Sequence, residues 1–181
     1  MFTYIVDEEV SLRLVERRHV EELFQVIVTN ADHVGRWLPF ARATTQVTDT
    51  LAFVDSALID FAAGKGLVAG IWYCSQLVGT IGLRIDKGHQ SASVGYWIDS
   101  SHEGRGIVTR ACRALINFAF DELKLHRIEI RANPGNVKSR AIPERLDFVE
   151  EGIVRGAFKL YDKFEDSIIY GLLCDEWHHK R

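Results

Sequence analysis

The chain has 181 residues, of which 47% are hydrophobic and 26% charged, and its formal net charge is -3 at pH 7. These values are typical of one soluble globular domain with a real core, so we expect a single domain over residues 1–181. They exclude neither an enzyme nor a binding module, but they give no support for nucleic acid as the principal partner or for a membrane-spanning segment. The N-terminal stretch lacks a basic region and reaches acids by Asp7, so no secretory signal is predicted and a cytoplasmic location is expected.

The three cysteines argue against two classes of site. They are odd in number and have no C-x-x-C spacing, which disfavours both a disulfide framework and a zinc site, and we expect no metal. Cys112 lies in an apolar helical pattern with no adjacent histidine. It is therefore interpreted as a buried structural thiol rather than a nucleophile.

The first part of the chain predicts a strand, a helix and an aromatic loop. Residues 11–15 alternate apolar and polar side chains, and apolar residues then recur with helical spacing over about residues 16–30. The segment 35–41 places Trp37 and Phe40 beside a proline. Two interpretations stay open for it: a loop pinned into the core by Trp37, or a wall of a substrate pocket.

A second helix and three strands follow. Thr48 is expected to cap a helix that ends at Gly64. Strand-like runs at residues 67–73 and 77–85 are separated by a two-residue turn and predict a hairpin. A further run at residues 94–98 predicts the fourth strand of the chain, antiparallel to the third.

A glycine loop, residues 101–106, then joins this strand to a long helix that begins at Ile107. Backbone amides in the first turn of a helix have no internal partner, and the helix dipole favours an anion beside them. Gly104 and Gly106 permit positive φ and a close approach of the backbone to such an anion. The third glycine of a dinucleotide fingerprint is missing at Thr109, and no Walker string occurs. The loop is therefore either a binding site for a phosphate of another kind or an ordinary turn between a strand and a helix.

The last third of the chain predicts a fifth strand, a short helix and two closing strands. Residues 127–132 alternate, and a helix follows over residues 137–146 with Asn136 as its cap. Pro143 removes one backbone donor and should bend that helix. The closing strands are expected at residues 148–154 and 167–173. A strand, a right-handed helical crossover and a strand predict that the fourth and fifth strands are parallel.

The motifs G-Y-W-I-D, G-R-G-I-V-T-R-A and S-R-A-I-P-E-R-L-D-F, in this order, resemble the GNAT superfamily of acetyl-CoA-dependent N-acetyltransferases. Within it the sequence is most similar to RimL-type enzymes, which acetylate the N-terminus of a ribosomal protein. The resemblance implies an α+β (mixed α/β) GNAT fold. Its central, mostly antiparallel seven-stranded sheet would have strands 4 and 5 as a parallel splayed pair, flanked by about four helices. It also implies acetyl-CoA as cosubstrate and a homodimer.

The resemblance assigns candidate residues to coenzyme A (CoA). The loop amides would hold its pyrophosphate, and they belong to Glu103, Gly104, Arg105, Gly106, Ile107 and Val108. The pantetheine arm would lie along Trp97 and Ile98, where the parallel strands separate, and Asn136 would hydrogen-bond the arm. Arg105 and Arg110 are either partners of the CoA phosphates or solvated cations at the helix end.

Three positions depart from the family pattern. Ser101 stands where Gln or Arg is usual, and Asp147 stands where glycine is customary before Phe148. Pro143 occupies the place at which many members carry a tyrosine that acts as general acid. This chain must therefore supply a proton or a hydrogen bond to the leaving thiolate in another way.

For the chemistry we expect direct attack of a neutral amine on the thioester. Ser139, one turn after Asn136, is the candidate hydroxyl for the thiolate, with a simple capping or solvated serine as the alternative. Asp99 or Glu103 could act as base through a water, or both are only loop charges. The favoured acceptor is a protein α-amino group. A small amine such as a polyamine or antibiotic and a non-catalytic acyl-CoA sensor stay open.

Overall fold

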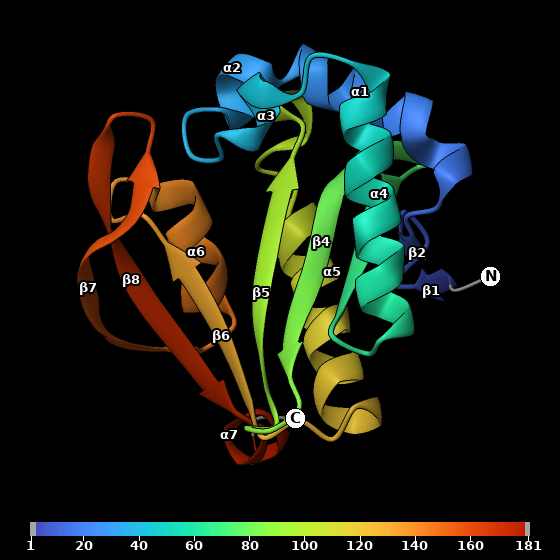
Figure 1. Cartoon of the computed structure of the whole chain (residues 1–181). Coiled ribbons are helices and arrows are strands. Elements are labelled where there is room, and N and C mark those ends of the chain that lie inside the picture. The colour runs from blue at the N-terminus through green and yellow to red at the C-terminus, as the bar shows by residue number, and fades with distance from the viewer. Residues whose placement is uncertain (1–2, 180–181) are drawn as a thin grey trace.

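The computed structural model describes residues 3–179, so the outermost residues of the predicted domain 1–181 lie outside this range. One mixed sheet runs through the molecule, with the strand order β1-β2-β3-β4-β5-β6-β8-β7 (Figure 1). The strands are β1 Thr3–Ile5, β2 Val10–Leu14, β3 Gly66–Tyr73, β4 Gln76–Asp86, β5 Ser91–Ile98, β6 Arg127–Ala132, β7 Val149–Leu160 and β8 Lys163–Leu173. The α+β class and all seven expected strands are confirmed. The last two strands are longer than the predicted 148–154 and 167–173, because most of the predicted loop between them continues the β7–β8 hairpin. Strand β1 was missed because three residues are too few to show alternation.

Four longer helices correspond to the predicted ones, and three short helices were not predicted. They are α1 Val20–Thr29, α2 Ala31–Val34, α3 Phe40–Ala43, α4 Val47–Ala62, α5 Ile107–Asn117, α6 Val137–Arg145 and α7 Cys174–His179. The prediction that Thr48 caps α4 was wrong. Gln46 is the cap, because its side chain and that of Asp49 bond each other's backbone amides in a capping box. The expected end at Gly64 is confirmed by its φ of +63°.

The sheet separates two hydrophobic cores. Helices α1 and α4 pack on β3 and β4 on one face, where Leu23 and Val54 are fully buried (Figure 1). Helix α5 packs on the other face against β2 and β5, and Ala111 and Cys112 on it are fully buried. Cys112 is buried, as predicted, and burial raises the pKa of its thiol.

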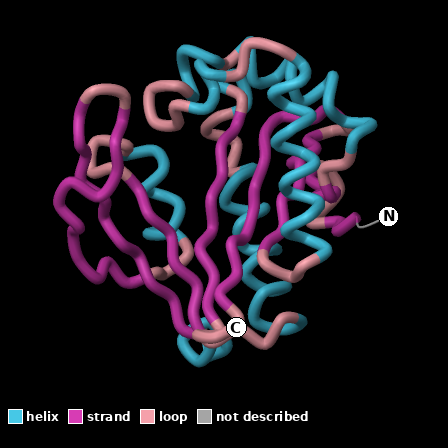
Figure 2. The backbone as a smooth tube through the Cα atoms, in the orientation of Figure 1, coloured by secondary structure: helices cyan, strands magenta, loops and turns pink. Residues whose placement is uncertain are grey.

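Strands β5 and β6 form the predicted parallel pair, and they separate halfway along. β5 pairs with β4 over its whole length, from Ser91 to Ile98. Its pairing with β6 stops at Val94 and Ile130. Beyond these residues the two strands diverge, which gives the sheet the V shape in Figures 1 and 2. We call this region the splay. Along it the β6-facing backbone edge of β5 has no strand partner among the described residues.

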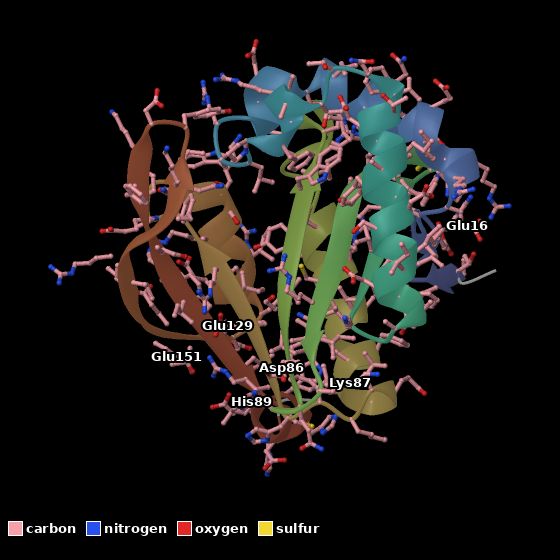
Figure 3. The ribbon with its side chains drawn as sticks, viewed as in Figure 1. Glu16, Asp86, Lys87, His89, Glu129 and Glu151 are labelled. Atoms are coloured by element: carbon pink, nitrogen blue, oxygen red, sulfur yellow. The ribbon has the colours of Figure 1, made fainter. Side chains whose placement is uncertain are left out.

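An ion-pair cluster crosses three neighbouring strands, β6, β8 and β7, in one arm of the V. Arg127 on β6 donates to both carboxylate oxygens of Glu151 on β7, at 2.6 and 2.5 Å, and to Glu129 at 3.3 Å (Figure 3). The Arg127–Glu151 pair passes directly over Gly171 of β8, where any Cβ would lie within 2.4 Å of it. The cluster thus ties β6 to β7 across β8, within a single arm of the V.

Helix α6 ends in a left-handed turn at Asp147, the position where the family favours glycine. The amide of Phe148 donates to Pro143 O at 3.0 Å and that of Asp147 to Glu144 O at 3.3 Å, which is a Schellman motif. Asp147 has a φ of +60°. A side chain with a Cβ is strained in this conformation, so α6 carries a local cost that glycine would remove.

We therefore expect Asp147→Gly to raise the free energy of unfolding by up to about 1 kcal/mol. Urea unfolding should show a higher midpoint with an unchanged slope. Asp147→Ala is the matched control, since it removes the same carboxylate but keeps the strained Cβ, and it should not gain stability. Equal effects of the two substitutions would show that the side chain, not the backbone conformation, sets the stability here.

Candidate active site

A cavity of about 2260 Å³ occupies the splay and continues to the start of α5 on one side and to the α2–α3 segment on the other. Most of the predicted site residues line it: Trp37, Phe40, Trp97, Ile98, Glu103, Gly104, Gly106, Ile107, Val108, Asn136 and Ser139. Asp99 and Arg105 are not among its lining residues. The structure thus brings together a glycine loop, an exposed strand edge and the first turn of α6 around one space.

The start of α5 has the features of an anion site. Gly104 and Gly106 have φ of +74° and +69°, and a Cβ on either would meet no atom within 4 Å. Gly106 is the residue before the helix, and no side chain caps the first turn. That turn also contains no acid. Its amides therefore face open space with the positive end of the helix dipole uncompensated, a combination that favours a bound phosphate.

The arginines near this helix are engaged elsewhere. Arg105 donates to Ser101 O at 3.2 Å, and its guanidinium lies 5.9 Å from the ring centre of Tyr73. Arg110 donates to Asp7 at 2.8 Å and to Glu9 at 3.1 Å. Arg110 thus ties α5 to the turn between β1 and β2 through two ion pairs. Arg110 also lines the cavity together with the glycine loop, whereas Arg105 does not.

The Arg110 ion pairs give a stability prediction with a definite pH dependence. Slight burial opposes the shift, but hydrogen bonds from the amides of Val10 and Glu9 and from Arg110 hold the pKa of Asp7 below its ordinary value of 3.8. The stabilisation is therefore present above that value and is lost as the pH falls through the lower folded-state pKa.

We expect Arg110→Met to lower the free energy of unfolding by at most about 1 kcal/mol at neutral pH, since the pair is partly exposed. The difference from wild type should shrink in urea unfolding measured well below pH 3.8. A fall in CoA affinity of about tenfold, 1.4 kcal/mol, with unchanged stability would instead assign Arg110 to a CoA phosphate.

Glu103 bridges the two sides of the cavity. Its carboxylate accepts a hydrogen bond from His33 Nε2 of α2 at 2.9 Å and another from Lys138 of α6. Partial burial works to raise the pKa of Glu103, but Lys138 and His33 together outweigh it, so this pKa lies below its usual value. The group stays ionised at neutral pH and is only a weak base.

Asp99 caps the short turn that leads into the glycine loop. It accepts hydrogen bonds from the amide and the hydroxyl of Ser101, at 3.1 and 2.8 Å, and lies 2.9 Å from His102 Nδ1. Burial of Asp99 acts to raise its pKa, yet these bonds lower it overall. With both oxygens engaged and no place in the cavity lining, Asp99 fits the predicted alternative of a loop charge better than that of a base.

The first turn of α6 presents Asn136 and Ser139 to the cavity. Asn136 is the helix cap, as predicted, and its Oδ1 accepts from the amide of Ser139 at 3.2 Å. The Asn136 amide nitrogen has no hydrogen-bond partner among the described residues. The Ser139 hydroxyl donates to the Tyr96 hydroxyl at 3.4 Å. A polar donor and a hydroxyl therefore stand side by side at the splay.

The aromatic loop forms the far wall of the cavity. Phe40 is 40% exposed, and its ring centre lies 6.2 Å from that of Trp97. Trp37 is half-buried, and its ring lies against Gly135 at the end of β6. Trp37 lines the cavity but belongs to neither hydrophobic core, so the structure does not support the alternative of a loop pinned into the core. Its position is suited to contact an acceptor.

Sequence reasoning missed three residues at this site. Tyr96 follows the strand pattern of β5 and gave no separate signal, and His33 falls in a short helix that was not predicted. Tyr161, at the tip of the β7–β8 hairpin, donates to Gly35 O at 2.5 Å, and Arg42 lies 5.3 Å from its ring centre. These contacts join the hairpin to the α2–α3 segment at the mouth of the cavity.

Two classes of structure are not found among the described residues. No helix within residues 3–179 has both the length and the apolar composition needed to cross a bilayer. No group of three or more His, Cys, Asp and Glu side chains in the same range is placed to hold a metal ion. We report both as findings on the described chain only.

A splayed parallel pair beside an uncapped helix start defines the class of acyl-CoA-dependent transferases that the motifs indicated, and comparison with known proteins agrees. A family model described as an acetyltransferase (GNAT) domain matches residues 9–149. The chain therefore belongs to the GNAT N-acetyltransferase family and is an enzyme of that family.

The chain is similar over its whole length to named relatives. It is 39% identical to the "Putative ribosomal N-acetyltransferase YdaF" of Bacillus subtilis, with 100% of each chain covered. It is 29% identical to the ribosomal-protein-serine acetyltransferase of Escherichia coli, with 96% of this chain and 97% of the relative covered. A solved structure, the microcin C7 self immunity acetyltransferase MccE in complex with acetyl-CoA and AMP, has a TM-score of 0.90 at 28% identity, covering 93% and 94% of the two chains.

Proposed function

We propose that this chain transfers the acetyl group of acetyl-CoA to the N-terminal α-amino group of a protein, and that a ribosomal protein is its substrate class. The observation that carries the proposal is the uncapped first turn of α5, at the wall of a cavity that continues into the splay. The names of the Bacillus subtilis and Escherichia coli relatives support the substrate class.

The residues around the cavity fit acetyl-CoA as cosubstrate. The open, left-handed glycines leave room for a diphosphate next to the amides of Ile107 and Val108. Asn136 offers an unused amide donor, and Trp97 and Ile98 present a free strand edge to which an amide-containing arm can bond in the manner of an added strand. Most of the proposed binding groups are thus backbone amides and carbonyls. In the sequence they are indicated only by the glycines of the motif.

In the proposed reaction the acceptor nitrogen bonds to the acetyl carbon while the carbon–sulfur bond breaks. The nitrogen loses a proton through a water to solvent or to Glu103, and the leaving thiolate is stabilised by a hydrogen bond from the Ser139 hydroxyl before it takes a proton from solvent. Ser139 acts as a neutral donor, because a thiolate with an ordinary pKa near 8.5 is a fair leaving group. Trp37 and Phe40 contact the acceptor on the other side of the cavity.

The weak base favours one class of acceptor. An α-amino group has a pKa of about 7.7 to 8.0, so a useful fraction is neutral near pH 7.5, whereas a lysine at about 10.4 needs a stronger base. Glu103 is held in ion pairs with His33 and Lys138, and its lowered pKa makes it poor at removing a lysine proton. The site is therefore better suited to a protein N-terminus than to a lysine side chain.

The test is an acceptor panel with acetyl-CoA, read out as release of free thiol and as the intact mass of each acceptor. The panel contains peptides with free N-termini, the same peptides with blocked N-termini and one lysine, and polyamines. We expect a mass gain of one acetyl group only in peptides with a free N-terminus, and a rate that rises with pH as the α-amine becomes neutral. Acetylation of the blocked lysine peptides alone would contradict the proposal.

A small amine is the second candidate acceptor. It is favoured by the structural similarity to MccE, whose name assigns it to microcin self-immunity and whose structure contains AMP. Against it, Arg36, His33 and Lys138 line the cavity, and Glu103 is already paired with two of them, which disfavours a polycation beside the glycine loop. The other lining acids are Asp60 and Glu129. Turnover of polyamines but of no peptide would establish this alternative.

A further inference from the structure

Pro143 leaves a carbonyl of α6 without its usual partner, and Tyr96 takes that place. In a regular α-helix the amide of residue 143 would bind the carbonyl of Ser139, but proline has no amide hydrogen. The Tyr96 hydroxyl donates to Ser139 O at 3.0 Å instead. Tyr96 lies on β5 and Ser139 on α6, so this bond joins the two elements that line opposite sides of the splay.

The same phenol also holds the Ser139 hydroxyl. A serine within a helix commonly turns its hydroxyl back onto the carbonyl four residues earlier. Here it donates to the Tyr96 oxygen at 3.4 Å, while the Ser139 amide donates to Asn136 Oδ1 at 3.2 Å. The amide, carbonyl and hydroxyl of Ser139 are therefore all positioned by groups at the wall of the cavity.

The phenol is suited to remain a donor at this place. Burial, and next the buried Cys112 thiol, raise the pKa of Tyr96, with Tyr170 adding to the shift and the Ser139 hydroxyl opposing it. Tyr96 thus stays protonated through the neutral range. Tyr170 on β8 fixes the helix itself, since its hydroxyl accepts from Arg140 at 3.0 Å and donates to Glu144 at 3.2 Å.

We propose that Tyr96 is a positioning residue for Ser139. Pro143 allows this because, without an amide hydrogen, it leaves the Ser139 carbonyl free to accept the Tyr96 hydroxyl. The inference rests on the proposed function, because Ser139 is taken there as the donor to the leaving thiolate. In this view the proline that replaces the usual tyrosine does not remove a hydroxyl from the site. It brings one from the neighbouring strand, which holds the Ser139 carbonyl and accepts the resting Ser139 hydroxyl. As the thiolate forms, the Ser139 hydroxyl turns its single proton from the Tyr96 oxygen to the sulfur.

Tyr96→Phe tests the role of the hydroxyl alone. We expect kcat to fall about 5- to 20-fold, because both hydrogen bonds with which Tyr96 positions Ser139 are lost, while KM for acetyl-CoA stays within about twofold. Tyr4→Phe, on β1 at the other edge of the sheet, is the matched control and should leave both constants unchanged. In the double variant with Ser139→Ala, the Tyr96→Phe change should cost nothing further, because its effect acts through the serine.

Pro143→Ala separates positioning from structural damage. Alanine restores the helix amide, which can bind Ser139 O and release Tyr96, so the urea midpoint should equal or exceed that of wild type while kcat falls. A wild-type kcat in Tyr96→Phe, or additive losses in the double variant, would overturn the inference. A wild-type protein that turns over no acceptor would overturn the proposed function instead, so the two failures are distinguishable.

Discussion

Gly106→Val is expected to weaken CoA binding at least about 100-fold, as measured by calorimetric titration. Gly106 precedes α5 with a φ of +69°, which a β-branched residue does not tolerate. To relieve the strain, the backbone must rotate and turn the first amides of α5 away from the cavity. Two or more hydrogen bonds to a charged diphosphate are then lost, each worth about 1.5 to 3 kcal/mol.

A matched control separates this effect from a general loss of stability. Gly156 on β7 has a similar φ of +58°, and its nearest atom would lie 3.9 Å from an added Cβ. Gly156→Val should therefore lose a comparable amount of stability in urea unfolding but keep its affinity for CoA. Equal losses of affinity in the two variants would mean that strain in the fold, rather than the amides of α5, explains the result.

Ser139→Ala is expected to reduce kcat by about 10- to 100-fold with the CoA dissociation constant unchanged. The hydroxyl is proposed to bond the thiolate as it forms, and a hydrogen bond to a charged group is worth about 1.5 to 3 kcal/mol. Binding should persist because the amide contacts at α5 and the Asn136 side chain remain. The measurement is steady-state turnover with a saturating N-terminal peptide, together with calorimetry of CoA.

Ser91→Ala is the control for this substitution. Ser91 lies on β5 at the closed end of the V, where β5 still pairs with β6. Removal of its hydroxyl should leave kcat within about twofold of wild type. Wild-type turnover in Ser139→Ala would assign Ser139 to the predicted alternative, a capping or solvated serine, and would leave the thiolate without a side-chain donor.

The fold was predictable to the extent that local patterns determine it. Alternation and helical spacing located all the long elements, and the handedness of crossovers predicted that the pair β5 and β6 is parallel. The position at which the pair separates was not predictable from spacing. It is seen only in the structure, as the end of pairing at Val94 and Ile130.

The candidate site was predictable where backbone conformation, rather than side-chain contacts, forms it. Gly104 and Gly106 indicated positive φ, and both have it. Side-chain partnerships were not predictable, because they join residues far apart in sequence. Tyr96 and Ser139 are 43 positions apart, and Arg110 and Asp7 are 103 apart. Arg110 was consequently considered as a phosphate ligand or a solvated cation, when it is an ion-pair partner.

The central claim is that the amides at the start of α5 bind the CoA diphosphate. The most direct measurement is a titration of the wild-type protein with CoA, followed residue by residue through backbone amide chemical shifts. The account predicts that the largest changes fall on Gly104 to Val108, with smaller ones at Asn136. Saturable binding that leaves these amides unchanged, or no binding at all, would contradict it.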